Sequence, residues 1–245
     1  MYINTSGLVL RETAYRDSSK ILTVLTGGEG KLTVSARGAL RKNSKLTAVT
    51  QLLAFSEMTL YCARERWTLT EARSVEQFIG LRDDIALLSL GAYFAELAEA
   101  VADEDSPNPE LLPLCLNALY ALSEKIRTPE QVKPAFELRL MSVSGFAPLI
   151  GRCCACGRER LERAFIDLAG GTLYCGDCKK EGGLSLGGGA LSAARYIVSC
   201  EPRKLFSFKL GEAALRELAL TAESYLLAHL DRRFRTLDYY KGLLV

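Results

Sequence analysis

Residues 21–35 read Ile-Leu-Thr-Val-Leu-Thr-Gly-Gly-Glu-Gly-Lys-Leu-Thr-Val-Ser, which is two β-rich segments around a glycine-rich turn. Leu32 and Val34 alternate with polar neighbours, so the second segment presents one apolar face, as a half-buried strand does. Glycine-rich turns between two such segments are typical of β-hairpins. The stretch therefore predicts a hairpin whose apolar face is turned towards a core.

More short strands are expected on either side of this hairpin. Residues 7–10 predict a strand before it, while residues 52–61 and a segment containing Trp67 and Leu69 predict strands after it. Five short strands within residues 1–80 suit a small closed barrel. We expect residues 1–80 to form a domain of their own built on such a barrel.

From Leu81 onward, apolar residues recur at the spacing of amphipathic helices. One such stripe consists of Leu87, Leu90, Phe94, Leu97 and Val101, and a second of Leu112, Cys115, Leu119, Leu122 and Ile126. Residues 130–143, 191–200 and 212–232 predict three more helices. We expect residues 81–245 to form a helical domain, interrupted by a cysteine-rich module at about 150–182. The fold class is therefore multi-domain α+β.

The module contains two Cys-x-x-Cys pairs, in Arg152-Cys-Cys-Ala-Cys-Gly-Arg158 and Tyr174-Cys-Gly-Asp-Cys-Lys179. A two-residue gap lets both sulfurs of a pair reach the same ion, and Zn²⁺ favours four tetrahedral thiolates. Four thiolates close the coordination shell, so the metal would be structural. The sequence predicts one structural Zn²⁺ per chain, with ligands Cys153, Cys156, Cys175 and Cys178.

Two disulfides or a redox dithiol are the alternatives for these cysteines. The N-terminus has no secretion signal, and Cys62, Cys115 and Cys200 are isolated in apolar segments, as reduced buried cysteines are. Stable disulfides are rare in a reducing compartment. The additional Cys154 leaves open whether Cys154 or Cys153 is the zinc ligand that acts together with Cys156.

A basic segment follows the hairpin and contains four cations and no acid. In a small barrel it would be a loop between strands, and OB-type barrels bind nucleic acids through such loops. Each neutralised phosphate releases counterions, so binding would weaken with salt. The alternative is a loop that only improves solubility. The predicted DNA-binding residues are Lys31, Arg37, Arg41, Lys42 and Lys45. The aromatic candidates for base stacking are Tyr15, Phe55, Tyr61 and Trp67.

No catalytic constellation is recognisable in the sequence. His229 is the only histidine, so a Ser-His-Asp site would depend on it, and no flanking motif supports one. The glycine-rich turn at residues 27–30 lacks the lysine and hydroxyl residue of a P-loop. A zinc hydrolase or deaminase would require an open metal position, which four thiolates do not leave. We expect that the protein is not an enzyme.

The order of these segments resembles the RecO family of bacterial DNA repair proteins. Across the whole chain an OB-type domain is followed by helices, a four-cysteine module and closing helices, as in that family. The N-terminal segments that carry the resemblance are Gly7-Leu-Val-Leu-Arg11, Tyr15-Arg-Asp-Ser18, Leu22-Thr-Val-Leu-Thr26, Gly30-Lys31, Ala36-Arg-Gly38 and Lys45-Leu46.

The resemblance implies that residues 1–80 form an OB-fold nucleic-acid-binding domain. It implies a recombination mediator that binds single- and double-stranded DNA and anneals complementary strands. It also implies cooperation with RecR in placing RecA on DNA coated by single-stranded DNA-binding protein. By the same resemblance, the helical domain is expected to bind the acidic C-terminal tail of that coating protein. The candidate residues are Lys133, Phe136 and Arg139.

A different class of function stays open, namely a zinc-stabilised scaffold that binds protein or RNA without annealing DNA. No stretch of the sequence has the length and apolar composition of a transmembrane helix. We expect a cytoplasmic, nucleoid-associated protein. The sequence leaves open whether the C-terminal cations Arg232, Arg233 and Arg235 extend the path of DNA.

Overall fold

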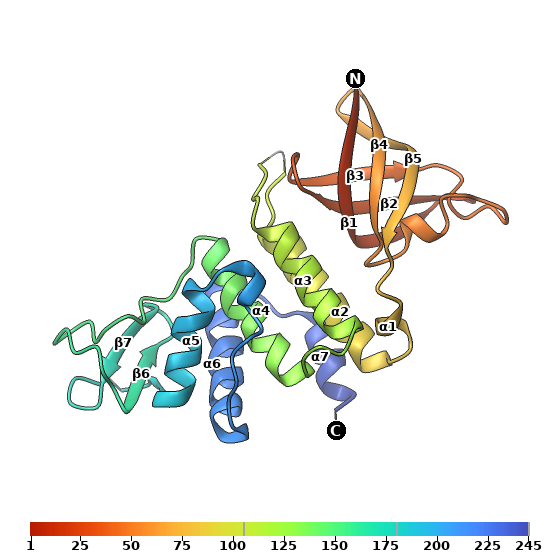
Figure 1. Cartoon of the computed structure of the whole chain (residues 1–245). Coiled ribbons are helices and arrows are strands. Elements are labelled where there is room, and N and C mark those ends of the chain that lie inside the picture. The colour runs from red at the N-terminus through yellow and green to blue at the C-terminus, as the bar shows by residue number, and fades with distance from the viewer. Residues whose placement is uncertain (105, 180, 245) are drawn as a thin grey trace. The chain divides into compact units, whose positions relative to one another are not determined.

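The computed structural model describes residues 1–104, 106–179 and 181–244, and Figure 1 shows the course of the chain. The chain packs as two compact units, one formed by Met1–Glu124 with Phe234–Val245 and the other by Lys125–Arg233. Within the described residues, no helix combines the length and the apolar composition that crossing a membrane requires. The expected domain boundary after residue 80 stays a prediction.

The first unit begins with a closed five-stranded barrel, drawn in red to orange in Figure 1. Around the barrel the strand order is β1-β2-β3-β5-β4. All neighbouring pairs are antiparallel except β3 and β5, which close the barrel in parallel. The predicted OB-like barrel is therefore confirmed. Its strands are β1 (Tyr2–Tyr15), β2 (Ser19–Thr26), β3 (Lys31–Ala36), β4 (Phe55–Ala63) and β5 (Arg66–Glu76).

The barrel interior follows from the alternation seen in the sequence. In β3, Leu32 and Val34 are buried whereas Thr33 is exposed. These side chains pack with Leu22 and Val24 of β2 in one apolar cluster. Burying an aliphatic side chain of this size stabilises a fold by about 1.5–3 kcal/mol, which explains why the inward positions of the strands are apolar.

The fourth strand begins at Phe55, three residues later than the sequence predicts. Leu53 is buried and adopts a positive φ of 65°. Its N–H donates to the Val9 carbonyl at 2.9 Å, and the Ala54 carbonyl accepts from the Val9 N–H at 3.0 Å. The apolar run at residues 52–54 is thus a turn that returns the chain to β1, preceded by the short 3₁₀ helix η1 (Ala48–Thr50).

Four helices complete the first unit, and α2 follows the predicted stripe. Leu90, Phe94 and Leu97 are buried, and the Asp84 carboxylate caps the start of the helix. The second stripe ends earlier than predicted, because Lys125 adopts a positive φ of 51° after the end of α3. The sequence did not predict α7. The helices are α1 (Ile79–Arg82), α2 (Ile85–Val101), α3 (Leu111–Ser123) and α7 (Arg235–Gly242).

The second unit consists of helices and a small antiparallel sheet with strand order β7-β6-β8. Helix α4 packs against both α5 and α6 and buries Val132, Phe136 and Leu140. The helical character predicted for this part of the chain is confirmed. The elements are α4 (Pro129–Val143), β6 (Arg163–Asp167), β7 (Thr172–Cys175), β8 (Leu184–Gly187), α5 (Gly188–Ser199), η2 (Pro202–Lys204) and α6 (Glu212–Leu230).

Candidate metal centre and nucleic-acid interface

The structure brings the four predicted cysteines together. The sulfur atoms of Cys153, Cys156, Cys175 and Cys178 all lie within 4.8 Å of one another. Cys175 is the last residue of β7, so the small sheet fixes one pair, while the loop before β6 supplies the other. Four sulfurs at this separation could hold one metal ion.

Each pair is folded into a tight turn by its own backbone. The Gly157 N–H donates to the Cys153 carbonyl at 2.8 Å, and Gly157 adopts a positive φ of 74°, which favours glycine. In the second pair, the Cys178 N–H donates to the Cys175 carbonyl at 3.1 Å. The two-residue gap therefore brings both thiols of each pair to the same cluster, as the sequence predicts.

The thiols differ in acidity because of their surroundings. Hydrogen bonds from the backbone N–H groups of Cys156 and Cys175 lower the pKa of Cys153 to about 6. Hydrogen bonds with the sulfurs of Cys175 and Cys156 raise the pKa of Cys178 to about 12. Thiolates this close repel one another, so a soft divalent cation between them fits the donor set.

Cys154 is turned away from the cluster. It is exposed, and its N–H donates to the Leu173 carbonyl of β7 at 2.8 Å, whereas Cys153 is only 1% exposed. All eight cysteines lie in the described part of the chain and are free thiols. The distance of 3.8 Å between the sulfurs of Cys156 and Cys175 is far longer than a disulfide bond of about 2.05 Å.

Arg195 of α5 supports the first pair in a way the sequence did not reveal. Its guanidinium donates to the carbonyls of Ile150 at 2.8 Å, Gly151 at 2.8 Å and Glu159 at 2.9 Å. These carbonyls lie on both sides of the Cys153–Cys156 turn. No signal in the sequence distinguishes this arginine from other helical cations, because its partners are backbone atoms some 40 residues away.

The predicted DNA-binding cations of residues 37–45, which we call the basic loop, all lie on the surface. Arg37, Arg41, Lys42 and Lys45 are exposed, and no ion pair is recorded for any of them within the described residues. The loop leaves the barrel at the end of β3. Gly38 has a positive φ of 70°, and the Arg41 N–H donates to its carbonyl at 3.1 Å.

Lys31 lies at the other end of β3 from the basic loop. It is half-buried, and its ammonium donates to the Glu99 carbonyl in the last turn of α2 at 2.9 Å. Lys31 is the first residue of β3 and lies six positions before Arg37, which is roughly 20 Å at 3.3 Å per residue. The structure therefore brings four of the five predicted cations together and places Lys31 apart from them.

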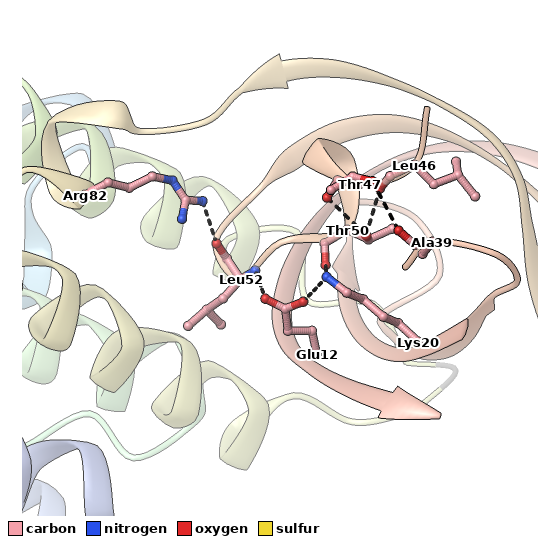
Figure 2. Close-up of polar contacts among 8 residues, drawn as sticks. All are labelled: Glu12, Lys20, Ala39, Leu46, Thr47, Thr50, Leu52 and Arg82. Carbon is pink, nitrogen blue, oxygen red and sulfur yellow. Dashed lines mark hydrogen bonds and ion pairs between the residues drawn. The ribbon is translucent and has the colours of Figure 1, made fainter. Parts of the chain in front are cut away.

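The basic loop is anchored to the barrel by the segment that follows it, residues 46–54, which we call the return segment. Figure 2 shows the polar contacts that hold it. The Lys20 ammonium donates to the Glu12 carboxylate and to the Thr50 carbonyl, and the other Glu12 oxygen accepts from the Leu52 N–H at 3.0 Å.

The alternation of residues along β2 is a sequence signal for the burial of Lys20, which was not among the predicted site residues. Lys20 is two positions before Leu22 and four before Val24, so strand alternation places it on the inward face of β2. A lysine in that register requires a partner. The partner is Glu12 of β1, which faces Leu22 across the ladder.

One exposed aromatic residue lies next to the basic loop. Tyr15 is 44% exposed at the β1–β2 turn, and the Arg16 guanidinium lies 5.1 Å from its ring centroid. This turn is joined to the loop by the Leu40 N–H, which donates to the Ser18 carbonyl at 3.0 Å. Trp67, by contrast, packs against the barrel core.

The residues expected to bind a partner are engaged inside the second unit. Phe136 is fully buried, and the Lys133 ammonium pairs with Glu137 at 2.7 Å and with Glu223 at 2.8 Å. The Arg139 guanidinium donates to the Val198 carbonyl at the end of α5 at 2.9 Å. The assignment of Lys133, Phe136 and Arg139 to a partner stays a prediction.

His229 lies among aromatic rings. Its ring centroid is 4.2 Å from that of Tyr225 in an edge-on arrangement, and it stacks on Phe146 at 5.9 Å. Within the described residues, its Nε2 is buried without a hydrogen-bond partner. The surroundings are those of a packed side chain, and the expectation that the protein is not an enzyme stays a prediction.

Comparison with known proteins covers nearly the whole chain. Residues 1–78 match the family model "Recombination protein O N terminal", and residues 82–238 match "Recombination protein O C terminal". A DNA repair protein RecO of Acetivibrio thermocellus is 33% identical, over 99% of this chain and 97% of the relative. Those of Symbiobacterium thermophilum and Caldicellulosiruptor bescii are 32% and 30% identical, each over 98% of this chain.

Proposed function

Since this chain belongs to the RecO family of DNA repair and recombination proteins, we propose that it is a DNA-binding recombination mediator. The observation that carries the proposal is the basic loop. It presents four exposed cations, without a recorded ion pair in the described residues, from a closed OB-like barrel. Such unneutralised cations favour a polyanion, because each phosphate they contact releases a condensed counterion.

Annealing follows from the same chemistry. Two complementary strands repel each other through their phosphates, and cations between them screen that repulsion. The loop cations contact phosphates and not base edges, so both single-stranded and double-stranded DNA bind to the loop. Tyr15, next to the loop, offers a ring on which an unpaired base can stack.

The proposed partners are those of a mediator. The chain would act with RecR to place RecA on DNA coated by single-stranded DNA-binding protein, in association with the nucleoid. Binding of that coating protein's tail at Lys133, Phe136 and Arg139 requires α4 to separate from its neighbours, because Phe136 is fully buried. A tail peptide that fails to bind while DNA binding is intact would remove this partner.

We propose that the metal is one Zn²⁺ per chain, held by Cys153, Cys156, Cys175 and Cys178. What supports this is the donor set, since four clustered thiols match a closed tetrahedral site. When bound, the ion would contribute folding free energy. The chain's own part is to hold the four sulfurs together through β7 and the two turns.

Strand annealing tests the proposed function. Two complementary oligonucleotides carrying a fluorescence donor and acceptor are mixed with wild-type protein or with an Arg41→Glu/Lys42→Glu variant. Wild type should accelerate annealing several-fold, and the variant should lose most of that acceleration. Equal acceleration by both proteins would move annealing away from the basic loop. No acceleration by either would contradict the mediator and favour a scaffold that binds protein.

A further inference from the structure

The barrel contains a charge pair where an apolar pair would suffice. The side chain of Lys20 is 10% exposed and that of Glu12 is 30% exposed. A buried ion pair adds little net stability, because the desolvation of both charges offsets their attraction, and apolar residues of similar volume often do as well. Its presence therefore calls for another explanation.

What the pair adds is directed hydrogen bonds to the return segment. Lys20 donates to the Thr50 carbonyl at 3.3 Å, and Glu12 accepts from the Leu52 N–H at 3.0 Å (Figure 2). Thr50 is fully buried, so its carbonyl needs a hydrogen-bond donor from the protein. The pair thus fixes one acceptor and one donor of a backbone that has no regular strand partner there.

The hydroxyl groups of two threonines in the return segment link that segment to the basic loop. The Thr50 hydroxyl donates to the Leu46 carbonyl at 2.7 Å. The Thr47 hydroxyl lies within hydrogen-bond distance of the Ala39 carbonyl, at 3.2 Å (Figure 2). It is also within hydrogen-bond distance of the Ser44 carbonyl, at 3.0 Å. Ala39 and Ser44 lie inside the basic loop, on either side of Arg41 and Lys42. A set of contacts therefore runs from the charge pair to the backbone that flanks the loop cations.

We infer that the Glu12–Lys20 pair and Thr47 are positioning residues, which hold the basic loop in the shape that binds DNA. The inference rests on the proposed function in placing DNA on the loop. A loop ordered before binding does not have to lose its conformational entropy on binding. Ordering even one residue costs enough to weaken binding about tenfold, so that is the loss expected when an anchor is removed.

Glu12→Gln distinguishes electrostatics from positioning, because the two predict opposite changes in the affinity for single-stranded DNA. The substitution removes a negative charge and releases a buried cation, so electrostatics alone predicts tighter binding of single-stranded DNA. Loss of positioning predicts binding about tenfold weaker. Glu57→Gln is the matched control, because it makes the same charge change in the exposed Glu57–Arg73 pair of the same barrel. It should bind as wild type or more tightly.

Thr47→Val is the second variant, in case Glu12→Gln fails to fold. Thr47 is exposed, and valine preserves its shape and charge, so the melting temperature should be unchanged. Binding of an oligothymidine, measured by anisotropy, should nevertheless weaken several-fold. A purely structural role would change melting without changing the affinity of the folded protein.

The outcomes separate the inference from the proposed function. In one outcome, wild type binds DNA, Arg41→Glu/Lys42→Glu does not, and both Glu12→Gln and Thr47→Val bind like wild type. The positioning role is then overturned, while the loop remains the DNA site. If wild type does not bind, or the charge reversal has no effect, the proposed site fails and the inference fails with it. Weaker binding by Thr47→Val at unchanged melting temperature supports the inference.

Discussion

At the scale of single residues, Cys175 shows how the chain prepares a metal ligand. Cys175 is 1% exposed, and its backbone N–H donates to the Cys153 sulfur at 3.3 Å. Such a hydrogen bond stabilises a thiolate, which is the form that binds metal. Cys175 is therefore both a ligand candidate and a donor to a second ligand candidate.

We expect Cys175→Ser to lose the bound metal and to destabilise the second unit, because binding free energy at a structural zinc site is also folding free energy, on the order of 10 kcal/mol. Metal content by mass spectrometry and thermal melting check this. Cys154→Ser is the matched control and should keep one metal per chain, since Cys154 is exposed outside the cluster. A Cys175→Ser protein with native metal content and melting would contradict the assignment.

How far the sequence predicts these residues depends on the range of their interactions. The four cysteines can be predicted from the sequence because each pair lies within one local turn. The basic loop can be predicted because its cations lie close together in the sequence. Strand alternation indicates that Lys20 is buried, but its role depends on Glu12 and Thr50, which lie on other segments and which the sequence does not connect with it. The positions of the aromatic candidates depend likewise on packing, which partly buries Trp67 against the barrel core but leaves Tyr15 exposed.

At the scale of elements, α4 and α6 are joined through a buried lysine. Burial opposes the charged form of Lys133, but the carboxylates of Glu137 and Glu223 outweigh it, so the pKa of Lys133 lies above its ordinary 10.5. A raised lysine pKa gives stability that is fully present below pH 10.5 and is lost as the pH rises through the value in the folded protein.

Lys133→Met should destabilise the second unit by about 3–5 kcal/mol at neutral pH, because it removes this cation from beside the fully buried Glu137 carboxylate. It should also flatten the loss of stability above pH 10.5. Denaturant unfolding at several pH values measures both effects. Arg216→Met is the control, since the Arg216–Glu212 pair on α6 is exposed and should matter little. Similar stabilities for the two variants would contradict the account.

Helix α5 and the cysteine module are joined through Arg195. We expect Arg195→Met to leave the helices folded but to weaken metal retention about tenfold or more, as losses of residues that orient ligands typically do. Competition with a chromophoric chelator measures this. Faster hydrogen exchange at residues 150–159 should accompany it. Unchanged retention and exchange would show that the two turns alone hold the site.

The elements were predicted where the pattern was long or regular. The five barrel strands and helices α2 and α4 follow from periodicity, as their buried positions show. Helix α7 was missed because eight residues make a weak pattern, and because its role is to pack on α2, far away in sequence. The glycine-rich segment at residues 182–189 contains β8, which pairs with β6 and which no regular pattern in the sequence predicts.

At the scale of the whole molecule, charge is distributed unevenly along the chain. Residues 1–80 contain 11 lysines and arginines against 7 acidic residues, whereas residues 81–127 contain 3 against 9. The net charge of +2 hides this difference. A polyanion is therefore expected to bind the barrel and to avoid the acidic segment, which makes the basic loop the central claim about function.

The most direct measurement is the fluorescence anisotropy of a labelled single-stranded oligonucleotide across a salt series, with wild type and an Arg37→Glu/Arg41→Glu/Lys42→Glu variant. Wild-type affinity should fall steeply with salt. The variant should bind more weakly and with a shallower slope, since each lost phosphate contact reduces the slope by about 0.7 for single strands. An unchanged slope in the variant would contradict the account and move the DNA site elsewhere, for example to Arg232, Arg233 and Arg235.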